Sequence, residues 1–203
     1  MIKNLKKIIV STTINHPTEA IEKFDNMRDW LLIVVGDKKT PKKYSLKNGI
    51  YLNPIDQVKI DKKLSQLLGW NCIERRNLGL VYAKKLNADI IALVDDDNIP
   101  YKNWGKNLVV GKKIKVNFFD IKNSVFDPLY YTNYSALWHR GYPVNLIDER
   151  EKIKPKKKFI TPHVQADFWN GDPDIDAICR MMLKPNCKFL SKNFPMFSKK
   201  LSP

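Results

Sequence analysis

Three consecutive aspartates, Asp95, Asp96 and Asp97, are the residues whose type and spacing most clearly indicate chemistry. They directly follow the apolar run DIIALV at 89–94, which predicts a buried β-strand. Adjacent carboxylates repel one another unless a cation neutralises them, and Mg²⁺ and Mn²⁺ prefer oxygen ligands. Because side chains alternate along an extended chain, Asp95 and Asp97 would form an Asp-x-Asp clamp for Mn²⁺ or Mg²⁺. The alternative is an acidic loop or a set of helix caps.

The glycine-rich signatures of nucleotide binding are missing from the sequence. No GxGxxG motif follows the first predicted strand, and no GxxxxGK[ST] motif occurs anywhere. A nucleotide would therefore be held through a metal, which agrees with the acidic triplet.

The elements that must position these aspartates follow an alternating order along the first half of the chain. Apolar runs predict buried strands at 7–12, 30–35 and 89–94, with a short strand at 51–52. Helical spacing predicts helices at 17–27, 53–68 and 75–86, with Asn53 as an N-cap, Pro54 at the first position and Gly69 as the stop. This order predicts a mostly parallel sheet flanked by helices, a Rossmann-like α/β fold. Ligands bind at the carboxyl ends of the strands in such sheets.

The second half of the chain has a weaker pattern. It predicts strands at 113–119 and 165–169, a charged exposed loop at 149–158 and a helix at 173–183. We expect a mixed continuation of the same sheet and a single domain over residues 1–203. The tyrosines and tryptophan between 125 and 142 would form either an acceptor-side surface or part of a core.

Six short segments, taken in their order along the chain, resemble those of a known protein family. STTIN (11–15), VVGDKKTP (34–41), YLNPIDQ (51–57), RRNLG (75–79), VDDDN (94–98) and WNGDPDIDA (169–177) together span almost the whole chain. The series resembles the reversibly glycosylated polypeptide (UDP-arabinopyranose mutase) and STELLO-like group of GT-A-type glycosyltransferases. The resemblance implies a GT-A fold, a nucleotide-sugar donor that is usually a UDP-sugar, a divalent cation, and transfer of a hexosyl or pentosyl group to a hydroxyl acceptor such as a glycan.

Two further consequences follow from the same resemblance. In its plant branch it implies sugar-nucleotide mutase activity in place of transfer. The chains of the group normally continue past the point that corresponds to Pro203, so either this chain is a truncated or minimal version or the remainder lies beyond the given sequence, and its catalytic completeness is open.

The resemblance also assigns residues to the donor site. Thr12, Thr13 and Asn15 would line the nucleoside pocket. Asp37 would accept a hydrogen bond from the base or ribose, with a turn-capping carboxylate as the alternative. Asp95 and Asp96 would lie at the diphosphate, and Asp95 and Asp97 would bind the metal.

Arg75, Arg76 and Asn77 contain a match to the Arg-Asn pair that many GT-A enzymes place near the donor. Arginine can hold a phosphate through two hydrogen bonds at once. We expect Arg76 and Asn77 to matter more than Arg75, because one of the two arginines could simply be solvated on a helix face.

The second acidic cluster, Gly171 to Asp176, supports two interpretations. Asp172 directly precedes Pro173, which suits the N-cap of the following helix, and Asp174 would then lie in the first turn. In the functional interpretation, Asp172 or Asp174 is catalytic: it faces the donor sugar or acts as a general base for the acceptor hydroxyl.

His139 and His163 are candidate third metal ligands, although a lone histidine is more often structural.

Composition sets limits on the class of protein. The net charge of +15 also suits a non-catalytic module that binds nucleic acid or an anionic surface, but the lysines are scattered and strand-end aspartates repel phosphate, so nucleic acid is disfavoured. No apolar run approaches the roughly 20 residues of a membrane span. Three cysteines without a CxxC pair, and an N-terminus unlike a signal peptide, predict a reduced protein of the cytoplasm.

Overall fold

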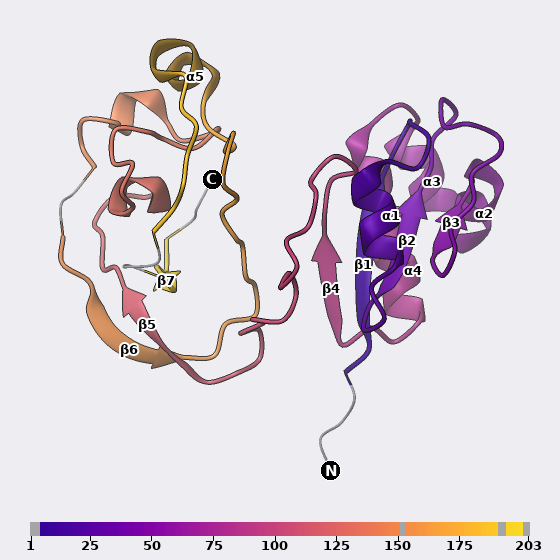
Figure 1. The fold of residues 1–203 in the computed structure, drawn as a ribbon, viewed down its shortest axis with the longest axis horizontal. Helices are drawn as coiled ribbons and strands as arrows, with labels where there is room; N and C mark the ends of the chain where they lie inside the picture. Colours follow the sequence, from indigo (N-terminus) through magenta and orange to yellow (C-terminus); the bar gives the residue numbers. More distant parts are fainter. Residues whose placement is uncertain (1–4, 151–152, 191–193, 201–203) are drawn as a thin grey trace. The chain divides into compact units, whose positions relative to one another are not determined.

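The computed structural model describes residues 5–150, 153–190 and 194–200, which fall into two compact units (Figure 1). The N-terminal unit comprises residues 1–106 and the C-terminal unit residues 107–203. Each unit has its own sheet and its own cluster of buried apolar side chains. The expectation of a single domain over the whole chain stays a prediction.

The N-terminal unit is built on a sheet of four parallel strands in the order β3-β2-β1-β4. The strands are β1 (Lys7–Thr12), β2 (Leu31–Val35), β3 (Ile50–Leu52) and β4 (Ile90–Leu93). The central strands β1 and β2 are continuous apolar runs because helices cover both faces of a parallel sheet. This mixed α/β architecture confirms the predicted Rossmann-like fold and agrees with a GT-A arrangement.

The helices of this unit begin close to the predicted positions. They are α1 (Glu19–Asp25), α2 (Pro54–Ile60), α3 (Lys62–Leu68), the short 3₁₀ helix η1 (Ile73–Arg75) and α4 (Arg76–Lys85). Asn53 caps α2 through its side chain, and Pro54 occupies the first turn, as predicted. The single helix expected over 53–68 is wrong: Asp61 ends α2, and its carboxylate accepts the backbone N–H of Leu64 at 2.9 Å to begin α3.

Helix α4 packs closely on the sheet because of one glycine. A Cβ on Gly79 would lie 2.5 Å from a side-chain carbon of Val10 and 2.8 Å from one of Val35, so only glycine permits this approach. The N-terminal end of α4, with Arg76 as its first residue, is thereby fixed over the central strands.

Strand β4 was predicted to be buried, and this is wrong in part. The strand forms, but it lies at the edge of the sheet, where Ile91 is 36% exposed and Leu93 51% exposed. An apolar run of this length does not distinguish an edge strand from a central one, because both contain β-branched and aliphatic residues.

The C-terminal unit has a separate three-stranded sheet in the order β6-β5-β7, so the predicted continuation of the first sheet is wrong. Its elements are β5 (Ile114–Phe118), the 3₁₀ helices η2 (Pro128–Tyr131) and η3 (Val144–Leu146), β6 (Lys156–Ile160), α5 (Ala177–Leu183) and β7 (Met196–Phe197). Strand β6 overlaps the end of the predicted loop 149–158, of which residues 151–152 lie outside the described residues. Residues 165–169 form no strand. Lysines dominate β6 because an edge strand tolerates and often carries them.

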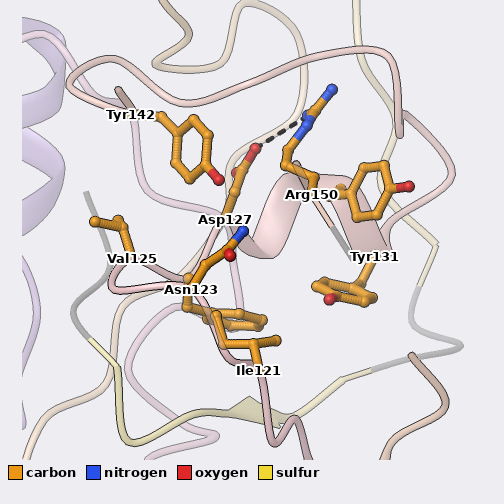
Figure 2. A pocket seen from close by; sticks show the side chains of 9 residues that line it. Ile121, Asn123, Val125, Asp127, Tyr131, Tyr142 and Arg150 are labelled. Atoms are coloured by element: carbon orange, nitrogen blue, oxygen red, sulfur yellow. Dashed lines mark hydrogen bonds and ion pairs between the residues drawn. The ribbon is translucent and has the colours of Figure 1, made fainter. Parts of the chain in front are cut away.

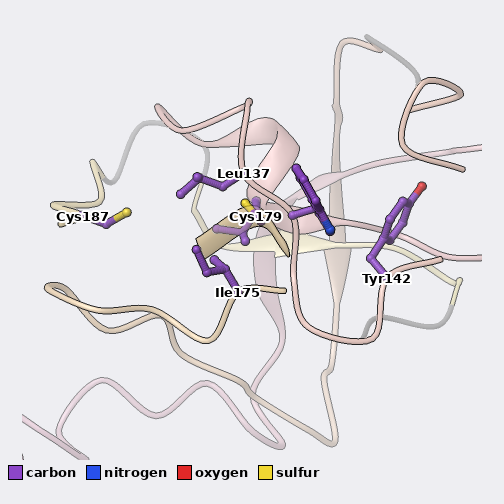
Figure 3. Close-up of a cluster of buried hydrophobic side chains, with 7 residues drawn as sticks. Leu137, Tyr142, Ile175, Cys179 and Cys187 are labelled. Atoms are coloured by element: carbon purple, nitrogen blue, oxygen red, sulfur yellow. The ribbon is translucent and has the colours of Figure 1, made fainter. Parts of the chain in front are cut away.

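The main core of the C-terminal unit is a cluster of side chains around α5 (Figure 3). Trp138 and Tyr142 are 8% and 3% exposed and belong to it, together with Cys179 and Cys187. Of the two predicted roles, an acceptor-side surface or part of a core, Trp138 and Tyr142 therefore have the second. Within the described ranges, no helix combines the length and the apolar character that a bilayer crossing requires.

Candidate functional site

The loops that follow β1 and β4 are bonded to each other at the carboxyl edge of the parallel sheet. Asp96 accepts hydrogen bonds from the Thr13 hydroxyl at 2.5 Å and from the Asn15 amide at 3.2 Å. The backbone carbonyl of Asp96 accepts the hydroxyl of Thr18, the N-cap of α1. Strands β1 and β4 are parallel neighbours, so residues some 80 positions apart in sequence meet here.

The three aspartates do not share one environment. A turn begins at Asp96, so the chain is not extended across all three residues, and alternation does not determine where their side chains point. Asp95 is 53% exposed at its side chain and pairs with Arg76, whose Nη2 lies 2.5 Å from Asp95 Oδ1. Asp96 faces the loop after β1, as described above. Asp97 is exposed, and no hydrogen bond or ion pair of its carboxylate occurs within the described part of the chain.

These carboxylates fit a hard divalent cation only as part of a larger ligand set. Among the described residues, no group of three acidic, histidine or cysteine side chains could by itself hold a metal ion. Asp95 and Asp97 offer exposed oxygen ligands, which Mg²⁺ and Mn²⁺ accept together with phosphate oxygens and water. The site therefore suits a cation that is shared with a substrate diphosphate.

Arg75 and Arg76 are neighbours with opposite surroundings. Arg75 is 1% exposed, and its guanidinium donates to the side chain of Gln57, to the Ser65 hydroxyl and to the backbone carbonyls of Ser65 and Gly69. It also stacks on Trp70, 3.7 Å from the ring centroid, and its burial lowers its pKa. Arg75 is thus an internal structural residue, whereas Arg76 lies at the strand-end site. Asn77 is exposed in the first turn of α4.

Asp37, at the end of β2, is held inside a turn. It is 6% exposed, and its carboxylate accepts the backbone N–H of Lys38 at 2.6 Å and that of Asn71 at 2.8 Å. Its own N–H donates to the Thr40 hydroxyl, which in turn donates to the carbonyl of Thr13. The carboxylate is thus a turn-capping group that ties the loop after β2 to the loop after α3, and Thr40 ties the loop after β2 to the loop after β1. Thr12 ends β1 in register with Val35.

Two stacked tyrosines belong to the same edge and were not singled out from the sequence. The rings of Tyr44 and Tyr51 lie 4.5 Å apart with an interplanar angle of 23°. The Tyr44 hydroxyl oxygen is buried without a hydrogen-bond partner among the described residues. Burial raises the pKa of Tyr44, and the nearby charge of Asp96 raises it further. Tyr44 lies in an irregular loop, where spacing carries no signal about its surroundings.

That loop is anchored by a single carboxylate of α1. Asp25 is 6% exposed and accepts three successive backbone N–H groups, from Lys47 at 2.5 Å, Asn48 at 3.1 Å and Gly49 at 2.6 Å. A Cβ on Gly49 would lie 2.9 Å from an Asp25 oxygen, so this close approach requires glycine. The anchor fixes the loop between β2 and β3.

The second acidic cluster, in the C-terminal unit, is arranged differently from the prediction. Asp176, and not Asp172, is the N-cap of α5, and its side chain accepts the N–H of Ile178 at 2.9 Å. Asp172 pairs with Arg180, and Asp174 pairs with Arg140 at 2.9 Å. The helix begins at Ala177, so Asp172 and Asp174 both precede it. Proline is favoured in the first turn of a helix, but Pro173 is not enough to start α5 at that position.

A buried ionic group in the C-terminal unit was also missed (Figure 2). Asp127 has a side chain 2% exposed and contacts His139 Nδ1 at 3.0 Å and Arg150 Nη1 at 3.2 Å. Tyr130 and Tyr142 line the same small cavity, which has a volume of about 10 Å³ and room for little more than one water molecule. His139 is therefore engaged by Asp127, and His163 is exposed.

Comparison with known proteins places the chain near one class of enzyme. It is 25% identical over 213 aligned residues, 97% of this chain, to the probable glycosyltransferase STELLO1 of Arabidopsis thaliana. It is also 25% identical over 189 residues, 85% of the chain, to the probable glycosyltransferase STELLO2 of the same plant. The chain spans about a quarter of these relatives, 27% and 24% of their lengths. No protein-family model matches the sequence.

These similarities support the glycosyltransferase part of the resemblance, and they do not extend to the reversibly glycosylated polypeptide group. Of the predicted donor residues, the structure joins Thr13, Asn15 and Asp96 by hydrogen bonds and Arg76 to Asp95 by an ion pair.

Proposed function

We propose that this chain is the donor-binding part of a metal-dependent glycosyltransferase, which moves a sugar from a UDP-sugar to a hydroxyl acceptor such as a glycan. The observation that carries the proposal is the meeting of Thr13, Asp96, Asp95 and Arg76 at the carboxyl edge of a parallel sheet. Two relatives named as probable glycosyltransferases support sugar transfer.

In this proposal the diphosphate of the donor binds at the N-terminal end of α4. Arg76 is the first residue of that helix and offers a guanidinium that can hold phosphate oxygens. Asn77 is exposed in the same turn and offers an amide donor. The N-terminal end of the α4 dipole adds a positive potential at the same place.

The metal would be held by Asp95 and Asp97 together with oxygens of the diphosphate. Bound there, Mn²⁺ or Mg²⁺ would offset the negative charge that develops on the leaving diphosphate. The chain's own residues have separate tasks: Thr13 and Asn15 hold Asp96, and Arg76 orients the diphosphate.

The nucleoside would lie against the loops after β1 and β2. Thr12 and Asn15 would lie at its border, and Thr40 connects the two loops through the backbone N–H of Asp37 and the carbonyl of Thr13. This role for Asp37 is indirect, because backbone N–H groups already occupy its carboxylate oxygens.

Asp172 and Asp174 stay the candidates for the general base that activates the acceptor hydroxyl. The Asp172 side chain is 70% exposed and that of Asp174 35%, so Asp172 is the more accessible of the two. A general base must come within hydrogen-bonding distance of the hydroxyl proton, which favours the accessible carboxylate.

The cytoplasmic location of the protein, expected from its sequence, stays a prediction.

The experiment is a calorimetric titration of UDP, and then GDP, into the protein with Mn²⁺ and again with EDTA. We expect one nucleotide to bind only in the presence of the metal, and Asp97→Ala to abolish that binding. Asp56→Ala is the matched control, since it removes one exposed aspartate of α2 far along the chain from the strand-end site. Metal-independent binding, or unchanged affinity in Asp97→Ala, would contradict the proposal.

A mutase reaction is distinguished from transfer by its products. Incubation of a UDP-pentose without any acceptor, followed by NMR of the sugar ring, would reveal a changed ring form only for a mutase. We expect no such change, because the two relatives are named as transferases.

A further inference from the structure

The N-terminal end of α4 carries an unusual charge for its position. Helix N-termini favour acidic side chains, yet the first turn of α4 contains no acidic residue and begins with Arg76 directly after Arg75. Arg75 is buried and satisfied by groups of its own unit, so it offers no donor to a ligand. The Arg76 guanidinium remains as the anion-binding group, because the backbone N–H of Arg76 already donates to carbonyls of η1.

A carboxylate of the same chain occupies this position. Asp95 Oδ1 lies 2.5 Å from Arg76 Nη2, which makes the contact a close, charge-assisted hydrogen bond. The Arg76 side chain is 18% exposed and that of Asp95 53%, so the guanidinium is mostly enclosed while the carboxylate can leave towards solvent. The Nε of Arg76 is buried without a partner among the described residues, so the contact with Asp95 does not use the full hydrogen-bonding capacity of the guanidinium.

We propose that Asp95 occupies, on Arg76, the place that a donor phosphate takes, and that this competition makes the binding of metal and nucleotide interdependent. The inference rests on the proposed donor site and adds to it the residue pair through which the metal and the nucleotide affect each other. A donor phosphate on Arg76 would release the Asp95 carboxylate, which would then serve with Asp97 as a metal ligand. Without the phosphate, Asp95 stays with Arg76.

Electrostatics gives the physical reason. A divalent ion on Asp95 would lie close to the Arg76 guanidinium, and two cations at such a distance repel each other. A bound diphosphate carries enough negative charge to offset the repulsion between the divalent ion and the Arg76 guanidinium. Coupling of this kind is reciprocal: whatever factor the nucleotide adds to metal affinity, the metal adds to nucleotide affinity.

The first test measures Mn²⁺ alone, by the loss of its free-ion electron paramagnetic resonance signal, without any nucleotide. We expect weak binding to the wild-type protein and about tenfold tighter binding to Arg76→Gln, which is the size of one charge-assisted hydrogen bond. Lys23→Gln removes the same charge from the exposed Lys23–Glu19 pair of α1 and should stay within about twofold of wild type. Equal or weaker Mn²⁺ binding by Arg76→Gln than by wild type would overturn the inference.

The second test uses inorganic pyrophosphate in EDTA and does not depend on the folding of an Arg76 variant. Asp95→Asn removes the competing charge, so pyrophosphate should bind it about fivefold to tenfold more tightly than wild type. A purely structural role for the Asp95–Arg76 pair predicts the reverse, a loss of affinity on mutation. Unchanged, weaker or undetectable pyrophosphate binding by Asp95→Asn would overturn the inference.

The two proposals fail in different ways. If UDP does not bind under any condition, the proposed donor specificity fails, while the Mn²⁺ and pyrophosphate measurements still decide whether Asp95 competes for Arg76. If UDP and Mn²⁺ bind together but both variants behave like wild type, the donor site stands and the competition does not exist.

Discussion

The two acidic clusters of the chain each contain three aspartates close together in sequence, and they differ in where their partners come from. Asp95 and Asp96 contact side chains of α4 and of the loop after β1, 19 to 83 positions away. Asp172 and Asp176 contact groups of α5, eight and two positions away. The first cluster joins separate elements of a sheet edge, whereas the second mainly begins and braces one helix.

The two clusters also differ in whether each of their carboxylates has a hydrogen-bonded or ionic partner. In the second cluster each of the three carboxylates has a hydrogen-bonded or ionic partner. In the first, Asp97 has none within the described residues, and Asp95 is exposed enough to change partner. A cluster that holds a ligand must leave ligating atoms unused, and among the described residues Asp97 is the carboxylate of the two clusters that has no partner.

The largest expected effect belongs to Arg75, the structural neighbour of Arg76. Arg75→Met would leave the side chains of Gln57 and Ser65 buried without their donor, so we expect a loss of about 3 kcal/mol in the free energy of unfolding. Urea denaturation followed by tryptophan fluorescence measures it. The exposed Arg28→Met is the control and should change stability by less than about 0.5 kcal/mol. Similar stabilities of the two variants would contradict the structural role of Arg75.

A smaller effect should follow from Asp96, whose carboxylate ties β4 to the loop after β1. Asp96→Ala removes the acceptor of the Thr13 hydroxyl and the Asn15 amide, and we expect a loss of roughly 1 to 2 kcal/mol. Asp174→Ala breaks a partly exposed pair with Arg140 and should cost less than about 1 kcal/mol. Thermal unfolding of both variants compares them, and an equal loss would remove the contrast between the clusters.

Within the second cluster, Asp176 and Asp172 form a matched pair. Asp176→Ala removes the N-cap of α5 and should destabilise the protein by about 1 kcal/mol. Asp172→Ala breaks an exposed ion pair with Arg180 and should cost less than about 0.5 kcal/mol. Chemical denaturation separates the two values. A larger loss for Asp172 would restore it as the cap that the sequence predicted.

The smallest effect is a dependence of stability on pH that the C-terminal core introduces. Burial raises the pKa of the Cys179 and Cys187 thiols above the unfolded value of about 8.5. A raised folded pKa means that the contribution to stability is present below pH 8.5 and is lost as pH rises further, because the unfolded thiols ionise first. Between pH 7.5 and 8.5 we expect a loss of roughly 0.7 kcal/mol or less by urea denaturation. The double variant Cys179→Ala/Cys187→Ala should show a smaller dependence, and an unchanged one would assign it to other groups.

Much of the N-terminal unit was predictable because its signals are local. The runs that became β1 and β2 are rich in apolar and β-branched residues, and Asn53-Pro54 is a start signal that depends on neighbouring residues alone. The C-terminal unit was predicted less well. Its strand β6 is mostly lysine, and its short 3₁₀ helices and long irregular segments are stabilised by contacts such as Asp127 with Arg150, which no periodicity reveals.

By itself the sequence determined the alternation of strands and helices in the N-terminal unit, the parallel α/β class and the place of Asp95 to Asp97 directly after a strand, because hydrophobic periodicity and caps are written in consecutive residues. Only the tertiary structure decided which arginine faces the site, that Asp37 is enclosed in a turn, that Asp176 caps α5, and that Asp95 rests on Arg76. Those outcomes depend on which side chains from distant segments compete for the same partner. Competition of that kind is settled by packing and charge in three dimensions.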